Sequence, residues 1–466
     1  MSNPRELPTD HLATTTKDGH RVYLYPADVR GFFRTLRNFL NVILIAFFLA
    51  LPWIRIGGRP AILLHLPERK FAILGIQFWA HDAPMLFFVI AGAVLTIFFI
   101  TAVWGRIWCG YACPQTVFVD GVFRKIERWI EGDSIARRRL DEGPWTSDKV
   151  FKKAAKWGVF VAVSLVIGHS FLATFTGTEA LAEMMKQSPL QSPGAFGVMA
   201  FISGLVLFDF GWFREQFCLI ACPYGRFQSV LMDDRSMVVG YDVKRGEPRR
   251  GVAPPNPPTG DCVNCYRCVA VCPTGIDIRR GTQMECIACT ACMDACDRVM
   301  EKIGKPTGLI RYKTFAGDRD QVSPFRPRSI LYAVLLALVA SALVVKIRNH
   351  QLVSADFVRA TEAPYQVVPN ADGGATVTNH FKLDIRNQDF DPSQVRVRLA
   401  EESKARGVEL VTVHPELELR AGELRRLDVF FRFPKSIVEK GRVQAFVEIA
   451  GKDLIRQEVR LVGPLF

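Results

Sequence analysis

The sequence predicts a multi-domain integral membrane protein, with an α-helical membrane unit of five transmembrane helices, a cysteine-rich domain and a C-terminal β-sandwich. Three observations lead to this prediction. Five long apolar runs divide the chain, all twelve cysteines lie between Cys109 and Cys296, and the C-terminal part alternates apolar with polar side chains. Because 49% of the 466 residues are hydrophobic and 23% are charged, disorder is excluded over most of the length.

Each apolar run approaches the length of a membrane-spanning helix, which is about 20 residues for about 30 Å of hydrocarbon. The runs cover about residues 36–54, 83–104, 157–175, 195–213 and 329–347. Four of them have a tryptophan at one end, as an aromatic belt at the membrane surface would require. A buried core helix is the alternative for any single run. No cleavable signal peptide is expected, since residues 1–38 are polar and mixed.

Loop charge predicts the orientation of these helices. Residues 105–156 carry eleven Lys or Arg residues, whereas residues 178–194 carry only Lys186. The positive-inside rule therefore places the N-terminus, this loop and residues 214–327 in the cytoplasm, and the C-terminal region on the opposite side of the membrane. The basic residues of the first outer loop, residues 55–82, weakly oppose this orientation. The net charge of +13 is better explained by the orientation of the helices in the membrane than by nucleic-acid binding, because the sequence contains no nucleic-acid-binding motif.

Eight cysteines follow a spacing that is typical of iron–sulfur proteins. Residues 262–273 read C-x2-C-x2-C-x3-C-P, and residues 286–297 repeat the four cysteines without the proline. Two such runs form the bacterial two-cluster ferredoxin pattern, in which the fourth cysteine of each run ligates the other cluster. The sequence therefore predicts a bacterial-type ferredoxin domain with two [4Fe–4S] clusters, one held by Cys262, Cys265, Cys268 and Cys296 and the other by Cys286, Cys289, Cys292 and Cys272.

Zinc binding and disulfide formation fit these eight cysteines less well. Zinc sites use pairs of C-x2-C, which leaves the third and fourth cysteine of each run without a role. Disulfides are not expected on the cytoplasmic side of a membrane. Asp297 stands where the second run would carry its proline, so the backbone turn and the potential of one cluster are less certain than the ligation.

The other four cysteines form two matching C-x3-C-P motifs, each a few residues beyond an apolar run on its cytoplasmic side: Cys109, Cys113, Cys218 and Cys222. Cysteines four apart share one face of a helical turn, and the proline marks a break. We expect these thiols to be functional, and copper binding, dithiol redox chemistry and ligation of a further cofactor all fit. The alternative is that they are small buried hydrophobes. Residues 117–130 have the spacing of an interfacial helix.

Several other residues are weaker candidates. Asp209 and His169 lie inside apolar runs, where ionisable groups are often functional, although Asp209 is close enough to the cytoplasmic end to snorkel. His65, His81 and the pair Met184-Met185 fall on the outer side and are candidate copper ligands. Scattered His and Met residues more often have no such role.

The chain beyond Tyr365 reads as a β-structure. About seven short strands with period-two alternation, separated by turn residues, predict an immunoglobulin-like β-sandwich. Because it holds no cysteine, we expect it to dock to a partner rather than to bind a metal through thiolates.

The expected domains are a cytoplasmic N-terminal segment (1–35), a four-helix membrane unit (36–235), the ferredoxin domain (236–327), the fifth transmembrane helix (328–347) and the sandwich (360–466).

This arrangement resembles the cytochrome c oxidase accessory proteins of the CcoG/FixG type. The similarity covers nearly the whole chain and includes the segment Arg245-Gly246-Glu247-Pro248-Arg249 and the strand start Asn379-His380-Phe381. Membrane quinol-oxidising ferredoxins of denitrification share the cysteine motifs, whereas the sandwich favours the oxidase accessory branch. The resemblance implies a protein of the bacterial inner membrane that helps supply copper to a cbb3-type oxidase by reducing Cu(II) to Cu(I).

The sequence thus predicts a membrane-bound iron–sulfur electron-transfer protein that acts as a cupric reductase. Electrons from a cytoplasmic donor would enter one cluster, pass to the other and reach copper at the four C-x3-C-P thiols, which are the expected catalytic residues. A quinol-linked electron-transfer subunit and a non-enzymatic assembly factor are the alternatives. The expected partners are the oxidase or its copper chaperones but no nucleic acid, and a homodimer is the default oligomer.

Overall fold

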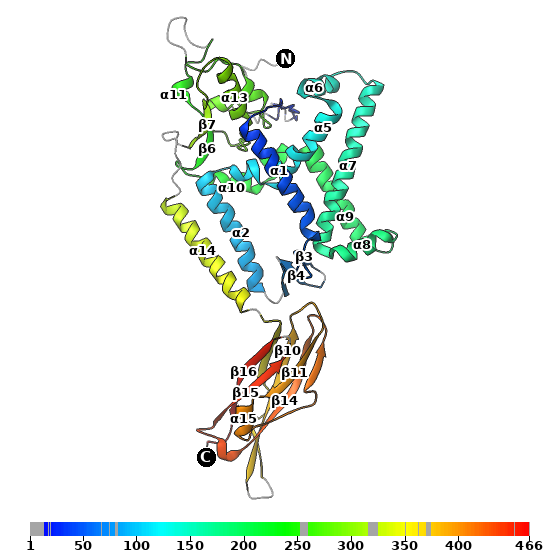
Figure 1. Ribbon diagram of the computed structural model, residues 1–466, viewed down its shortest axis with the longest axis vertical. Coiled ribbons are helices and arrows are strands. Elements are labelled where there is room, and N and C mark those ends of the chain that lie inside the picture. Colours follow the sequence, from blue (N-terminus) through cyan, green and yellow to red (C-terminus); the bar gives the residue numbers. More distant parts are fainter. Residues whose placement is uncertain are drawn as a thin grey trace. The chain divides into compact units, whose positions relative to one another are not determined.

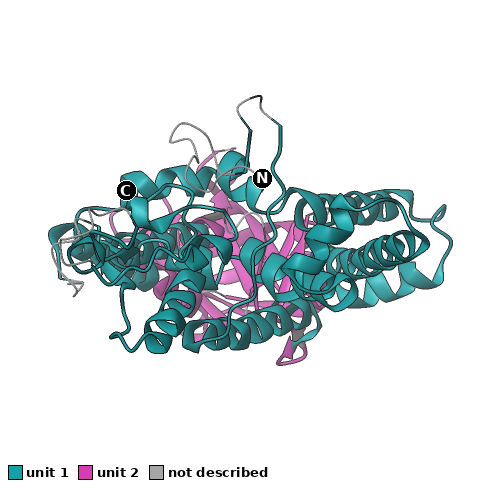
Figure 2. Cartoon of the chain, turned by 90° about the horizontal axis from the view of Figure 1, so that it is seen from above, with its two compact units in different colours: residues 1–54, 88–341 teal, residues 55–87, 342–466 magenta. Residues whose placement is uncertain are grey.

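The computed structural model describes residues 14–465, apart from 17, 19, 67, 74, 80–82, 252–259, 316–324, 350, 362, 370–373 and 452. The chain forms two compact units, residues 1–54 with 88–341 and residues 55–87 with 342–466, which Figure 2 colours separately. The expected linker at 252–258 and His81 lie outside the described residues.

Five helices among the described residues are long and apolar enough to span a membrane, which confirms the five predicted spans. Their exposed apolar side chains, such as Phe39, Phe87, Phe201 and Leu338, would face lipid. The helices are α1 (Phe32–Ala50, continued by η2, Leu51–Trp53), α2 (Ala83–Trp104), α7 (Ser147–Thr176), α9 (Pro193–Val206, continued by the π-helical η5, Leu207–Phe213) and α14 (Pro327–Arg348) (Figure 1).

Helix α7 begins ten residues before the predicted span. Thr146 caps it, because its hydroxyl accepts a hydrogen bond from the amide of Lys149 at 3.2 Å. Its first turns are polar and extend beyond the apolar run. At its other end α7 crosses α9 closely: a β-carbon at Gly168 would overlap the side chain of Ser203.

Short helices follow the two membrane hairpins. After α2 come α3 (Ile107–Tyr111), α4 (Pro114–Phe118), the π-helical η4 (Val119–Phe123), α5 (Arg124–Glu131) and α6 (Ser134–Glu142). After η5 come the π-helical η6 (Phe217–Ala221) and α10 (Pro223–Leu231), and α8 (Thr178–Lys186) joins α7 to α9. The expectation of an interfacial helix over 117–130 is wrong for its first part, because Val117, Phe118 and Phe123 are buried, the two phenylalanines in one core with Phe160.

The cysteine-rich domain is built around one antiparallel strand pair. Strand β6 (Met237–Tyr241) pairs with β7 (Ile310–Thr314), and the cysteine loops lie between them in the chain. The intervening elements are α11 (Val243–Gly246), α12 (Arg267–Ala270), η7 (Ile278–Arg280) and α13 (Ala291–Lys302). Asp297 lies within α13 and accepts a hydrogen bond from the amide of Gly308 at 2.7 Å, so the helix continues where the other run has its proline.

The second unit contains the predicted immunoglobulin-like sandwich, which the structure confirms. One sheet has the order β12-β14-β10-β8 with β9 also paired to β10, and the other has the order β13-β11-β15-β16. Inward apolar residues of both sheets form one core, and β10 and β11 alternate buried with more exposed positions. The strands are β8 (Val353–Arg359), β9 (Gln366–Pro369), β10 (Ala375–Asn387), β11 (Ser393–Leu399), β12 (Glu409–Thr412), β13 (Glu416–Leu419), β14 (Leu424–Pro434), β15 (Arg442–Ala450) and β16 (Leu454–Val462), with α15 (Glu401–Ala405) and η8 (Lys435–Ile437) between them.

Residues 55–82, predicted as the first outer loop, belong to this second unit. They form β1 (Arg55–Ile56), β2 (Arg59–Pro60) and the antiparallel sheet β3 (Ile62–His65), β4 (Lys70–Ile73) and β5 (Ile76–Trp79). The indole of Trp79 donates a hydrogen bond to the carbonyl of Gln388 at 2.8 Å and packs edge-on against Phe390. This contact joins the small sheet to the sandwich.

Candidate electron-transfer site

The structure gathers the eight ferredoxin-type cysteines around two voids. One void is lined by Cys262, Cys265, Cys268 and Cys296, and the other by Cys272, Cys286, Cys289 and Cys292 with Cys268 in the wall between. These are the two sets of four that the spacing predicts. All twelve cysteines of the chain are described, and none of them forms a disulfide. Their arrangement therefore fits two clusters.

Both cysteine loops adopt the same unusual backbone conformation. Asn264 and Tyr266 in the first loop, and Ala288 and Thr290 in the second, have φ between 51° and 60°. They occupy equivalent positions, before and after the second cysteine of each run. Residues other than glycine seldom adopt this left-handed conformation, and such strain concentrates at functional sites. The two loops are thus structural repeats of each other.

The cysteines of these loops are enclosed enough to disfavour a free thiolate. Burial raises the pKa of Cys268, Cys286 and Cys296 to about 12. A metal centre that replaces the thiol proton would remove this penalty, because iron binds the thiolate. Among the described residues, no three His, Cys, Asp or Glu side chains converge on a single ion. Thiols that stand apart suit a cubane, in which each iron takes one cysteine.

The two C-x3-C-P motifs also share one backbone conformation. Cys113 and Cys222 each cap a helix whose first residue is the following proline, and their φ and ψ values are −64° and 125°, and −72° and 112°. The amide of each donates a hydrogen bond of 2.8 Å to a carbonyl five residues earlier, that of Trp108 or Phe217. The proline begins a helix here because it needs no amide partner at that position.

The four C-x3-C-P thiols lie close to one another. Burial raises the pKa of Cys109 to about 12, and electrostatic repulsion by Cys113 and Cys222 adds to this rise. The pKa of Cys218 is raised by burial and by the same three thiols. The Nε2 amide of Gln228 donates a hydrogen bond to Cys109 Sγ at 2.7 Å, a contact that sequence reasoning missed. The four thiols are half-buried.

The first C-x3-C-P motif is docked on the second cysteine loop. Gly110, next to Cys109, packs so tightly that a β-carbon there would lie 2.9 Å from the carbonyl carbon of Ala288 and 3.1 Å from the carbonyl oxygen of Ile287. Both of these residues lie between Cys286 and Cys289. A glycine inside a short helix was the one available signal for this contact.

Side chains on either side of Gly110 reinforce the same joint. The buried guanidinium of Arg106 donates hydrogen bonds to the carbonyls of Cys286, at 2.9 Å, and Met284. The hydroxyls of Tyr111 and Thr290 are 3.0 Å apart. The ferredoxin loop and the membrane motif thus form one packed structure.

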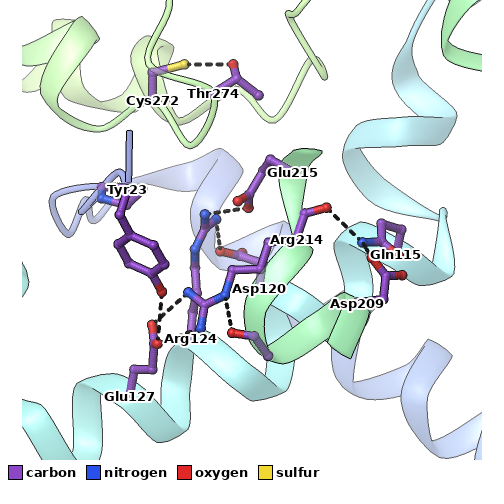
Figure 3. A network of polar contacts seen from close by, with 12 residues as sticks. Tyr23, Gln115, Asp120, Arg124, Glu127, Asp209, Arg214, Glu215, Cys272 and Thr274 are labelled. Carbon is purple, nitrogen blue, oxygen red and sulfur yellow. Dashed lines mark hydrogen bonds and ion pairs between the residues drawn. The ribbon is translucent and has the colours of Figure 1, made fainter. Parts of the chain in front are cut away.

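A charged network lies beside the motifs, as Figure 3 shows. Burial alone would raise the pKa of Asp120, but Arg37, Arg34 and Arg124 hold it well below its usual range. Burial likewise opposes ionisation of Glu127, yet Arg214 lowers its pKa to about 2. Both carboxylates are therefore charged and bind the helices together.

Of the weaker candidates, Asp209 contacts the first C-x3-C-P motif: it accepts a hydrogen bond at 3.1 Å from Nε2 of Gln115, two residues beyond Cys113 (Figure 3). The others have local contacts, and His169 Nδ1 lies 2.7 Å from the carbonyl of Leu165 in its own helix. His65 lies in β3, where its Nδ1 accepts from the amide of Glu68. Met184 and Met185 lie in α8.

Comparison with known proteins identifies the family. Residues 213–315 match a 4Fe-4S dicluster domain, residues 85–132 match a 4Fe-4S binding domain, and residues 343–464 match the IG-like fold at the C-terminus of FixG. Residues 85–132 contain two cysteines, fewer than the four thiolates of a [4Fe–4S] cluster.

Three relatives extend this match. Protein RdxA of Cereibacter sphaeroides is 36% identical over 422 residues, 86% of each chain, and RdxB of the same organism is 34% identical over 412 residues, 84% of each chain. The nitrogen fixation protein FixG of Rhizobium meliloti is 39% identical over 307 residues, 63% of this chain and 57% of that protein. The chain is therefore a membrane-associated iron–sulfur electron-transfer protein of the FixG family.

Proposed function

We propose that this protein is a cupric reductase of the bacterial inner membrane that supplies Cu(I) for assembly of a cbb3-type oxidase. Each Cu(II) ion takes up one electron and becomes one Cu(I) ion at the C-x3-C-P thiols. The N-terminus and the ferredoxin domain are cytoplasmic in this proposal, and the sandwich is periplasmic, where it would meet the oxidase or its copper chaperones.

The contact between Gly110 and Ala288 is the observation that supports this proposal most directly. The backbone of Gly110, the residue after Cys109, packs directly against the backbone of the loop between Cys286 and Cys289. We assign Cys286, Cys289, Cys292 and Cys272 to the cluster nearer the C-x3-C-P motifs. When bound, the two clusters supply one-electron storage and transfer.

The residues of the C-x3-C-P motifs are the reason why we propose copper as the electron acceptor. Four neighbouring thiols offer soft ligands, which favour Cu(I) over Cu(II), so that binding itself promotes the reduction. Burial raises the pKa of Cys109 to about 12, so the thiol is protonated at neutral pH and copper binding releases a proton. Gln228 stabilises the resulting thiolate through its hydrogen bond to Sγ.

The test replaces Cys109, Cys113, Cys218 and Cys222 by serine together. Wild-type protein in detergent should carry about eight iron atoms per chain, as two [4Fe–4S] clusters require. Supplied with a chemical reductant and Cu(II), it should form Cu(I), which a chelator captures. The four-serine variant should keep the same iron content and form no Cu(I) above background.

Different outcomes point to different functions. A loss of about four iron atoms in the variant would mean that these thiols hold a further cluster. Normal Cu(I) formation by the variant would place copper reduction elsewhere. Indifference to copper together with reduction by a quinol would favour the quinol-linked alternative. Variants in the cluster cysteines that lower only protein abundance would favour the non-enzymatic assembly factor.

A further inference from the structure

Of the eight ferredoxin-type cysteines, one is exposed. Cys265 reaches the surface, whereas the seven others are buried or half-buried. The second loop, by contrast, is covered at Ala288 by the C-x3-C-P motif that contains Gly110. The cluster set that includes Cys265 is therefore the one that an outside molecule can approach.

The rim around Cys265 carries unpaired positive charge. Arg267 follows Cys265 by two residues and lines the same void, and the amide of Arg250 donates a hydrogen bond to the carbonyl of Cys262 at 3.0 Å. Both arginines are exposed, and within the described part of the chain neither side chain has an acidic partner. Both therefore lie beside the ligand set that contains Cys265.

The acidic residues of the same domain are mostly engaged. Asp261 pairs with Arg245 and with Lys305, and Asp277 pairs with Arg279 at 2.7 Å. Asp297, next to Cys296, accepts a hydrogen bond from the amide of Gly308 at 2.7 Å. These acids therefore do not pair with the exposed arginines beside Cys265.

The loop itself is held rigidly. The guanidinium of Arg279 lies 4.1 Å from the centre of the Tyr266 ring and donates a hydrogen bond to the side-chain oxygen of Asn264 at 2.6 Å. These contacts fix the residues on both sides of Cys265. A partner could thus dock without reordering the loop, and rigid surfaces bind with a smaller loss of entropy.

We propose that this surface is the docking site of the electron donor, a small acidic one-electron carrier protein. Opposite charge steers the carrier to the rim of Arg250 and Arg267 and brings its redox group to Cys265. One electron leaves the reduced carrier and one electron enters the chain, so that no proton or atom need be exchanged. The proposal rests on the proposed function only for the direction of electron flow.

The test measures binding and electron uptake without copper. The probe is a purified plant-type [2Fe–2S] ferredoxin, and the protein is the full chain in detergent. The variant replaces Arg250 and Arg267 by glutamate. The control replaces Arg406 and Arg432 by glutamate, which makes the same change in net charge on exposed residues of the sandwich.

At low ionic strength the rim variant should bind the ferredoxin at least about tenfold more weakly than wild type and take up electrons correspondingly more slowly. The difference should disappear at high ionic strength, because salt screens exposed charges. The control should change by less than about twofold. Equal losses in both variants, or no loss in the rim variant, would overturn the proposal.

Two further measurements keep the result interpretable. If the glutamate variant loses iron, the same arginines are replaced by glutamine and the binding of ferredoxin is measured again. The glutamine variant should show a smaller but measurable loss of ferredoxin affinity. Dithionite reduction should proceed equally in all variants, since it needs no docking. Copper reduction by dithionite-reduced wild type tests the proposed function separately, so that failure of either proposal leaves the other measurable.

Discussion

The joint between the membrane motif and the ferredoxin loop can be tested by replacing Gly110 with alanine. The added β-carbon would lie 2.9 Å from the carbonyl carbon of Ala288 and closer still to its oxygen. Ordinary contact begins at 3.4 Å, and the oxygen is the nearest atom, so the joint must open by more than about 0.5 Å. Overpacking of this kind costs about 1–3 kcal/mol.

The opened joint should also slow electron transfer to copper. Misplacement by about 1 Å can cost about 10²-fold in rate, so we expect roughly a tenfold slower Cu(II) reduction in G110A. The iron content should remain that of the wild type, because no ligand is changed. The control is Gly158→Ala in α7, where a β-carbon meets nothing within 4 Å. A wild-type rate in G110A, or an equal loss in the control, would refute the argument that this joint carries electrons.

Three further predictions concern the supports of the site and of the fold. Arg106→Gln leaves the carbonyl of Cys286 without its charged donor, which should cost about 1–3 kcal/mol and speed iron loss to a chelator, measured by cluster absorbance. The pKa of Glu127 is lowered to about 2, so its contribution to stability is complete above its unfolded pKa of about 4.3 and is lost as the pH falls through 2; thermal unfolding of E127Q should therefore depend less on pH in this window. Trp79→Ala removes the anchor of the small sheet on the sandwich and should destabilise that unit by about 3–5 kcal/mol in denaturant unfolding, and an unchanged unfolding curve would contradict the packing described.

The features predicted from the sequence are those that local patterns determine. Apolar run length predicts the membrane helices, and the period-two alternation in β10 predicts the sandwich. Cysteine spacing predicts which thiols share a void, because the loop geometry follows from the repeat itself. These signals need no knowledge of distant residues.

The features that sequence reasoning missed depend on long-range contacts. The fit of Gly110 against Ala288 joins residues far apart in the chain, and nothing in either segment specifies the other. The small sheet β3-β4-β5 is held on the sandwich by the hydrogen bond from the indole of Trp79 to the carbonyl of Gln388. Phe123 is buried rather than interfacial because Phe160 and Phe210 pack against it. Burial of an amphipathic segment depends on which helices surround it.

In the mechanism we propose, electrons held in the ferredoxin domain reach copper at the C-x3-C-P thiols. The most direct measurement is an anaerobic titration of the purified protein, reduced with a known amount of dithionite, with Cu(II) added in steps. Cluster absorbance and chelator-bound Cu(I) are followed together. We expect one Cu(I) for each electron lost from the clusters, and no such coupling in the four-serine variant. Clusters that stay reduced until a quinone is added would contradict the account.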